Sequence, residues 1–210
     1  MADDTTYRTE QEAFWAGEFG NAYIARNAAP ELLAANLSLF SEVLGHTRGI
    51  DSAIEFGANI GMNLRALRQL LPRAQLAGIE INAQAASSLR SLAYVDVRHQ
   101  SILEYSPKDT HDLAFIKGVL IHIDPDSLSA VYDALYASTR KYLCVVEYYN
   151  PTPVSIAYRG HAERLFKRDF AGEILDRFSD LRLVAYGFKY HRDPAFEFGD
   201  ETWFLMERNA

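Results

Sequence analysis

Ser52-Ala-Ile-Glu-Phe-Gly-Ala-Asn-Ile-Gly-Met-Asn-Leu-Arg65 is the stretch around which this 210-residue chain is organised. Residues 52–56 form an apolar run that favours a β-strand, and leucines from position 64 onward recur at helical spacing. Between them, Gly57 and Gly61 allow a sharp turn and a close approach of ligand or helix. A strand, a glycine turn and a helix together form the arrangement that receives a nucleotide-type ligand at a helix N-terminus.

The next apolar run, residues 75–81, carries a second acid, Glu80, near its end. An acid at the tip of the second strand of such a unit accepts the hydroxyl protons of a ribose. The alternative is that Glu55 and Glu80 are solvated loop acids, but their spacing with the glycines favours a nucleotide site. Position 59 is Asn and position 62 is Met, so the third glycine of the dinucleotide fingerprint is missing, which disfavours a nicotinamide-dependent oxidoreductase.

Strands alternate with helices along the whole chain, which predicts a mainly parallel sheet in a single domain, 1–210. The last two strands have no helix between them, so the final strand is predicted to return antiparallel as a hairpin. Residues 1–45 are predicted to be a helical cap on a core that spans 50–210, and residues 148–167 a long polar and aromatic loop. The predicted helices are 8–26 (interrupted by glycine), 30–44, 62–71, 83–91, 126–139 and 168–178; the predicted strands are 52–56, 75–81, 94–98, 112–117, 142–147, 181–188 and 202–207.

Composition narrows the class of protein. A net charge of −7 argues against broad nucleic-acid binding, which needs a basic face. The single cysteine, Cys144, lies in an apolar run and is expected to be a buried small residue. One cysteine cannot form a disulfide within the chain, which fits a reducing cytoplasm. The N-terminus lacks the apolar core of a signal peptide, and no apolar run approaches the roughly 18 residues of a membrane span. The six histidines are scattered, so no metal site is predicted, and oligomerisation stays open.

Residues 55–61 and 78–82 resemble the cofactor site of class I S-adenosylmethionine-dependent methyltransferases, in which Glu-x-Gly-x-x-x-Gly is typical. Further stretches resemble the methylases associated with pseudaminic acid biosynthesis, and the likeness covers nearly the whole chain. It implies a Rossmann-like fold with a seven-stranded, mainly parallel sheet and S-adenosylmethionine as the cofactor. It also implies a nonulosonic-acid-type sugar, or its nucleotide-activated form, as the methyl acceptor. The stretches that carry the second likeness are 15–20, 117–123, 147–153, 158–161, 166–172 and 190–194.

The same resemblance assigns residues to the cofactor. It places the glycine turn under the amino-acid part, Glu80 on the ribose and Ile81 beside the adenine. Ser101 occupies the position beside the adenine where Asp is commoner, which leaves the adenine hydrogen bond open. The residues assigned to the cofactor in the core are Glu55, Gly57, Asn59, Gly61, Glu80, Ile81, Ser101, Ile102, Lys117 and Gly118.

Aromatic residues of the N-terminal region are expected to cover the cofactor. Trp15 and Tyr23 would fold over it and exclude water, and Arg26 would pair with its carboxylate. The alternative is that the aromatic residues only pack the cap.

A proton acceptor is expected after the fourth strand, where His122 lies in a Leu-Ile-His-Ile run. If the acceptor is a hydroxyl or an amine, a nearby histidine takes its proton as the methyl group is transferred. The alternative is a histidine satisfied by backbone groups, with His161 and Glu147 as rival bases.

The segment after the fifth strand is expected to bind the acceptor. Its cationic and aromatic side chains suit a small anionic molecule, since arginine grips a carboxylate or phosphate and tyrosine packs against a sugar ring. The alternative is a solvated entry to the next helix, with its cations paired to Glu163 and Asp169. The residues assigned to the acceptor are Tyr148, Tyr149, Asn150, Tyr158, Arg159, His161 and Arg164.

Together these patterns predict a methyltransferase that positions an oxygen or nitrogen of a small acceptor for in-line displacement. A methylase of a non-sugar metabolite and a non-catalytic protein that binds S-adenosylmethionine remain the alternatives.

Overall fold

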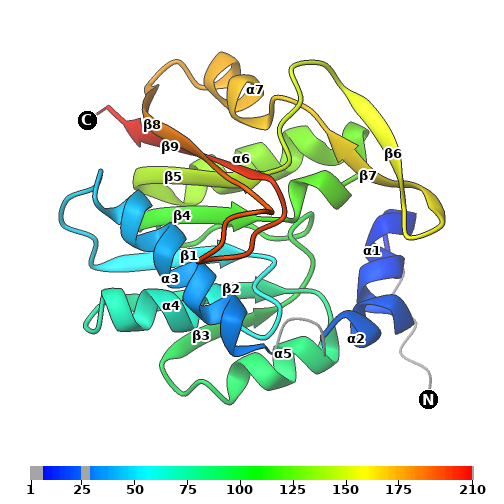
Figure 1. The fold of residues 1–210 in the computed structure, drawn as a ribbon, viewed down its shortest axis with the longest axis horizontal. Coiled ribbons are helices and arrows are strands. Elements are labelled where there is room, and N and C mark those ends of the chain that lie inside the picture. Colours follow the sequence, from blue (N-terminus) through cyan, green and yellow to red (C-terminus); the bar gives the residue numbers. More distant parts are fainter. Residues whose placement is uncertain (1–6, 25–28, 210) are drawn as a thin grey trace.

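The computed structural model describes residues 7–24 and 29–209, with the backbone alone for 161–163. Seven strands form one sheet in the order β3-β2-β1-β4-β5-β9-β8 (Figure 1). β1 pairs in parallel with β2 and β4, whereas β9 is antiparallel to both β5 and β8, so the predicted closing hairpin is confirmed. The strands are β1 Ser52–Phe56, β2 Gln75–Glu80, β3 Val95–His99, β4 His111–Lys117, β5 Thr139–Glu147, β8 Leu181–Lys189 and β9 Glu201–Arg208.

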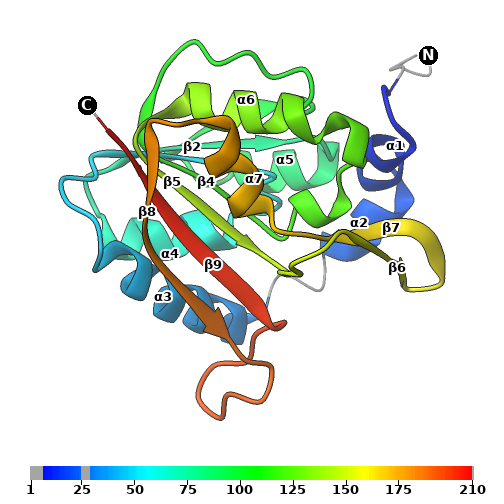
Figure 2. The ribbon, with the colours of Figure 1, turned by 90° about the horizontal axis from the view of Figure 1, so that it is seen from above.

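Helices cover both faces of the sheet, as Figure 2 shows from above. Leu39 and Phe40 of α3 and Leu64 of α4 share one buried apolar cluster with Phe115 of β4. α6 and α7 pack on the opposite face, where Val131 and Ile174 join Ile54 and Ile116 in the second cluster. The helices are α3 Pro30–Leu44, α4 Met62–Leu70, α5 Ala83–Arg90, α6 Leu128–Ser138 and α7 Phe170–Arg177, and two short 3₁₀ turns, η2 Leu120–His122 and η3 Pro125–Ser127, precede α6.

The central strands are buried on both faces, which explains their nearly continuous apolar sequence. All five residues of β1 are buried, including Glu55. The chain runs outward from β1 to β2 and β3 on one side, and continues with β4 and β5 on the other. The carboxyl ends of β1 and β4 therefore flank the point where the strand order reverses, which is where ligands bind in sheets of this type.

The N-terminal helices split into two groups. α1 (Glu10–Ala16) begins with a capping box, in which Thr9 and Glu12 exchange hydrogen bonds, and Gly17 separates it from α2 (Glu18–Ile24). These two helices lie at the carboxyl end of the sheet (Figure 1), whereas α3 packs against α4 on the sheet face. The cap is therefore confined to α1 and α2, and α3 belongs to the core layer.

The prediction of a loop over 148–167 was wrong. The segment contains β6 (Val154–Tyr158) and β7 (His161–Lys167), which pair as an antiparallel hairpin outside the main sheet. Arg159 and Gly160 both have positive φ, 50° and 86°, as a two-residue hairpin turn requires. Most of β6 is exposed, so no buried face marks it as a strand.

Candidate functional site

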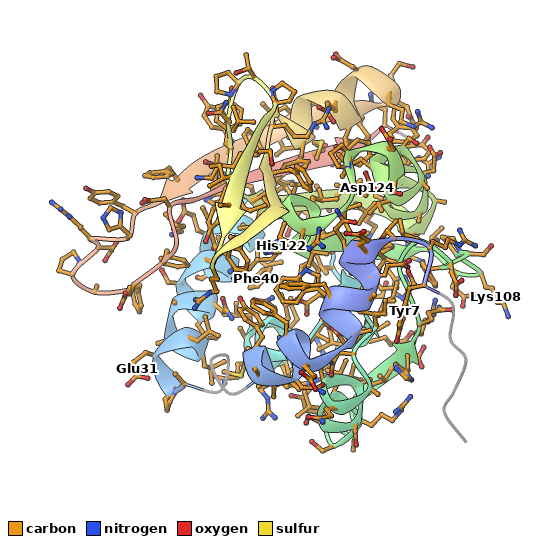
Figure 3. The ribbon with its side chains drawn as sticks, turned by 90° about the vertical axis from the view of Figure 1, so that its right-hand side faces the viewer. Tyr7, Glu31, Phe40, Lys108, His122 and Asp124 are labelled. Atoms are coloured by element: carbon orange, nitrogen blue, oxygen red, sulfur yellow. The ribbon has the colours of Figure 1, made fainter. Side chains whose placement is uncertain are left out.

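A cavity of about 230 Å³ lies beyond the carboxyl ends of β1, β2, β4 and β5. Residues of α1, α2 and β6 also contribute to its wall. Figure 3 looks onto this end of the molecule, where His122 lies between the β6–β7 hairpin and α1. The cavity is thus formed at the switch point of the sheet and covered by segments distant in sequence.

The glycine turn after β1 forms one wall of the cavity. Gly57 has φ 77°, and a Cβ there would lie 2.5 Å from Val119 Cγ2, so only glycine fits this position. Gly61 has φ 82° and caps α4, but its surroundings are Leu89 and Leu92. Gly61 therefore allows the close approach of the α5 region, whereas Gly57 shapes the cavity.

Glu80 joins the glycine turn to the start of α5. Its buried carboxylate accepts hydrogen bonds from the backbone N–H groups of Asn59 and Asn82, both at 2.7 Å. Burial raises the pKa of Glu80, and the hydrogen bonds from the backbone oppose that rise. The backbone N–H groups of Asn59, Ile81 and Asn82 therefore leave part of the acceptor capacity of this carboxylate for a hydroxyl proton of a ligand.

Glu55 is fully buried at the end of β1. Its Oε1 accepts a hydrogen bond from the Asn63 side chain at 2.5 Å, and within the described chain Oε2 has no partner. Burial raises the pKa of Glu55 to about 8, despite the opposing effects of Asn63 and Lys117. A cationic ligand would favour the ionised form of this carboxyl.

Glu147, predicted as a rival base, shapes the turn that follows β4. Its Oε1 accepts the N–H groups of Val119 and Leu120, both at 2.8 Å. Burial raises its pKa to about 8. These contacts identify Glu147 as the residue that holds the 118–122 turn in place.

Lys117 forms an ion pair with a residue that the sequence patterns did not single out. Its Nζ lies 2.8 Å from Glu201 Oε1 at the start of β9, and both side chains are largely buried. Burial alone would lower the pKa of Lys117, but Glu201 raises it above the usual value. This cation is thus neutralised within the protein.

His122 lies in η2 with its ring in the cavity wall. Nδ1 is 2.5 Å from the carbonyl oxygen of Arg164, and because a carbonyl only accepts, Nδ1 must carry the proton. Burial lowers the pKa of His122 to about 4, so the ring is neutral near pH 7 and Nε2 carries a lone pair. The rings of Trp15 and Tyr158 pack against it, with centroids at 4.7 and 4.9 Å.

The cap is attached to the core at the end of β2. The Asn82 side chain donates to the carbonyls of Trp15 and Ala16 and to Asn21 Oδ1, while its Oδ1 caps α5. Ser101 makes a second attachment, because its hydroxyl donates to the carboxylate of Glu12.

Several buried polar atoms of cavity-lining residues have no hydrogen-bond partner among the described residues. Six are side-chain oxygens, and the remaining atom is a donor, Trp15 Nε1. Two of the oxygens belong to Glu55 and Glu147, whose raised pKa of about 8 is close enough to neutrality for a nearby positive charge to favour their ionised, accepting form. Such atoms are costly to bury unpaired, so the cavity suits a ligand that offers several donors or a positive charge. The oxygens are Asn36 Oδ1, Glu55 Oε2, Asn59 Oδ1, Asn63 Oδ1, Glu147 Oε2 and Glu201 Oε2.

Most residues assigned to the cofactor are brought together in this cavity. Trp15 and Tyr23 of the cap line it, and so do Tyr148 and Tyr158, which were assigned to the acceptor. Arg26 lies outside the described residues. The core residues of the cofactor set that line it are Glu55, Gly57, Asn59, Glu80, Ile81, Ser101, Ile102, Lys117 and Gly118.

Four other residues assigned to the acceptor do not line the cavity. The side chains of Tyr149, Asn150 and Arg159 are at or near the surface. Arg164 forms an ion pair with Glu10 of α1 at 2.9 Å. His161 begins β7, and its side chain lies outside the described part of the chain.

Sequence reasoning missed several polar lining residues, among them Glu12, Asn36, Asn63, Asn82 and Glu201. The Thr-x-x-Glu capping box was a readable signal for the helix that carries Glu12. The contacts of Asn36, Asn63, Asn82 and Glu201 depend on packing between distant segments and had no local signal. All of these residues line the cavity.

No protein-family model matches the chain, and no curated protein sequence matches it. Solved structures do resemble it. Magnesium protoporphyrin IX methyltransferase from Synechocystis PCC 6803, with bound S-adenosylhomocysteine, is 13% identical, with a TM-score of 0.71 over 95% of this chain and 100% of that chain. The 1,6-didemethyltoxoflavin-N1-methyltransferase from Burkholderia thailandensis, also with bound S-adenosylhomocysteine, is 13% identical. Its TM-score is 0.72 over 99% of this chain and 94% of that chain.

An S-adenosylmethionine-dependent methyltransferase from Leishmania major is 14% identical, with a TM-score of 0.72 over 95% of this chain and 82% of that chain. At these identities the likeness establishes the fold. The chain has the Rossmann-like methyltransferase fold, with a mostly parallel seven-stranded sheet, an antiparallel last strand and an N-terminal helical region.

Proposed function

We propose that this protein is an S-adenosylmethionine-dependent methyltransferase that acts on an oxygen or nitrogen of a small molecule. The observation that carries the proposal is the set of buried side-chain oxygens that have no partner within the described chain, around a cavity at the switch point of a methyltransferase fold. S-Adenosylmethionine offers a sulfonium, an ammonium, ribose hydroxyls and an amino group, which match an acceptor-rich wall. Such a wall is poorly suited to the pyrophosphate of a nicotinamide dinucleotide.

The residues that would hold the cofactor lie on both sides of the glycine turn. Glu80 would accept a ribose hydroxyl proton, because its backbone partners leave part of the acceptor capacity of the carboxylate free. Glu55 and Asn63 would face the positively charged amino-acid part. The N-cap of α4 is Gly61, which carries no side chain to cap the helix, so the first turn of α4 offers backbone N–H groups for the carboxylate.

The cofactor would supply a methyl group that is already activated by its sulfonium. The protein then contributes by positioning the acceptor and excluding water. Trp15, Tyr23 and Tyr158 line the covered side of the cavity and provide that exclusion.

His122 is the best-placed group to receive the acceptor proton. Its Nδ1–H is fixed by the Arg164 carbonyl, so the lone pair of the neutral ring is on Nε2. The lowered pKa keeps the ring unprotonated at neutral pH. Glu147, with a pKa raised to about 8, is mainly protonated there and is the weaker candidate.

Two acceptor classes follow from different observations. The resemblance in sequence favours a nonulosonic-acid-type sugar or its nucleotide-activated form, which is anionic. The cavity wall favours a neutral or amine-bearing acceptor, because the cation Lys117 is already paired with Glu201 and the carboxyl of Glu147 keeps an oxygen, Oε2, without a partner among the described residues. The neutral or amine-bearing class is the better supported of the two.

Calorimetric titration with S-adenosylmethionine and S-adenosylhomocysteine tests the proposal, with Glu80→Ala as the variant that should lose binding. A Glu31→Gln variant, altered at an exposed carboxyl at the start of α3 that does not line the cavity, serves as the matched control. Absence of binding to the folded wild-type protein would refute the proposed activity. Turnover of acidic sugars compared with hydroxyl- or amine-bearing neutral and cationic acceptors would then decide the acceptor class.

A further inference from the structure

Glu12 brings a carboxylate from the cap into the cavity wall. The side chain is 7% exposed, although it belongs to the first turn of a short N-terminal helix. Its Oε2 accepts the backbone N–H groups of Arg8 at 2.7 Å and Thr9 at 3.1 Å. Its Oε1 accepts the hydroxyl proton of Ser101, a residue far away in sequence.

The second contact is more than helix capping. In a capping box the glutamate reaches back to the backbone of its own helix, which Oε2 already does here. Ser101 gives its only proton to Glu12 and accepts the N–H of Leu103 at 3.0 Å, so its hydroxyl has no proton left to donate to a ligand. Oε1 of Glu12 retains a lone pair. Because Glu12 and Ser101 both line the cavity, this oxygen can accept a hydrogen bond from a ligand that lies next to Ser101.

The neighbouring residues place this carboxylate near the base of a bound nucleoside. The 100–102 segment is adjacent to the ribose-binding position, because the N–H of Gln100 donates to the carbonyl of Glu80 at 3.1 Å. Ile81, which follows Glu80, and Ile102, which follows Ser101, also line the cavity and offer apolar contacts for a base. A base attached to a ribose held at Glu80 therefore meets the 100–102 segment and Glu12.

We propose that Glu12 recognises the adenine of the cofactor by accepting a hydrogen bond from its 6-amino group. This inference rests on the proposed function. Ser101 orients the carboxylate, and the apolar side chains hold the ring. The acceptor comes from the cap, so the helix that covers the cavity also determines which base is accepted.

The cap is suited to this task because other contacts fix α1 to the same segment. The Arg8 guanidinium donates to the carbonyl of Leu103 at 3.0 Å and lies 3.6 Å from the carboxylate of Glu104. These contacts hold the first turn of α1 over residues 101–104. A carboxylate held in this way needs little reorganisation when a base binds.

The test compares two probes that differ at one edge of the base. S-Adenosylhomocysteine has a 6-amino donor, whereas S-inosylhomocysteine has a carbonyl acceptor there. Calorimetry on the wild-type protein should show a preference for S-adenosylhomocysteine. Glu12→Gln should weaken its binding by about ten- to hundredfold, as expected for losing a hydrogen bond to a charged group, and should abolish the preference.

Two further variants separate recognition from structure. Thr9→Ala removes the hydroxyl that accepts the Glu12 N–H but keeps the carboxylate, so it should destabilise α1 and leave the preference intact. The double variant Glu12→Gln/Ser101→Asp carries a carboxylate at position 101 in place of the one lost at position 12. It should restore the preference for S-adenosylhomocysteine over S-inosylhomocysteine.

Equal binding of both probes to the wild type, with the proposed activity intact, would overturn this inference alone. So would an unchanged preference in Glu12→Gln, or a loss of binding in that folded variant that Ser101→Asp does not reverse. Failure of the wild type to bind either probe would overturn the proposed function as well.

Discussion

Two buried carboxyls should make the ligand-free protein less stable as the pH rises through neutrality. Burial raises the pKa of Glu55 and of Glu147 to about 8, whereas an unfolded glutamate titrates near pH 4.3. Between those values the folded state holds a proton that the unfolded state lacks. The free energy of unfolding then falls by about 1.4 kcal/mol per pH unit for each carboxyl.

The size of the effect can be worked out for the interval from about pH 6.5 to about pH 7.5. The two carboxyls together lower the free energy of unfolding by about 2–3 kcal/mol over this unit. His111 and His122, whose pKa values burial lowers, oppose this by only a few tenths of a kcal/mol each, because an unfolded histidine has already lost most of its proton. The expected net loss is about 2 kcal/mol, a large part of a typical domain stability of about 5–15 kcal/mol.

Urea unfolding at the two pH values measures this difference. Glu147→Gln keeps an oxygen that accepts the N–H groups of Val119 and Leu120, so it should remove about half of the pH dependence while preserving the turn. Glu104→Gln, at a half-exposed position, should leave the pH dependence unchanged. The reasoning would be refuted if the free energy of unfolding of the wild type stayed constant or rose over this interval. It would also be refuted if Glu147→Gln lost as much free energy of unfolding over the interval as the wild type.

Three further predictions concern the cavity. Gly57→Ala would place a methyl group 2.5 Å from Val119 Cγ2 at φ 77°, so it should lower the free energy of unfolding by about 1–3 kcal/mol and abolish S-adenosylhomocysteine binding, as measured by urea unfolding and calorimetry. Asn82→Ala removes the cap of α5 and the donor to the carbonyls of α1, so it should cost about 1–2 kcal/mol and make residues 7–24 easier to cleave in limited proteolysis. His122→Asn keeps a donor for the Arg164 carbonyl but loses the ring nitrogen Nε2; kcat should fall by about 10²–10⁴-fold with KM little changed, and equal activity would exclude His122 as the base.

The core of the fold was readable because its signals are local. A buried parallel strand has a continuous apolar sequence, and a turn that demands φ 77° demands glycine at Gly57. Glu80 follows from its place at the tip of the second strand, where chain geometry alone directs its carboxylate toward the turn. These features need no knowledge of distant residues.

The β6–β7 hairpin was missed because its signals are weak, although they exist. Val154, Ile156 and Tyr158 alternate with small residues, and Arg159-Gly160 is a possible two-residue turn. Val154 and Ile156 are about 40% exposed, so neither face of the strand is clearly buried. Without a buried face, alternation over so few residues does not distinguish a strand from a loop.

Contacts between distant segments had no local signal at all. Glu201 follows a turn-rich stretch and could have been any exposed acid, yet it forms the buried ion pair with Lys117. Glu12 was readable as a capping residue, but only the fold brings it to Ser101. Burial of such polar groups depends on partners that the linear sequence does not identify.

The cations after the fifth strand show why a cluster in sequence is not a cluster in space. Side chains alternate between the two faces of a strand, so β7 sends neighbouring residues in opposite directions. Arg164 reaches α1, Lys167 lies 4.9 Å from the ring centroid of Tyr148, and Arg168 forms an ion pair with Glu173 of α7. A set of positive charges that would suit an anion in a flexible loop is thereby divided among three partners. The cavity keeps Tyr148 and Tyr158 of this segment, and the carboxyl groups in its wall come from other strands and from the cap.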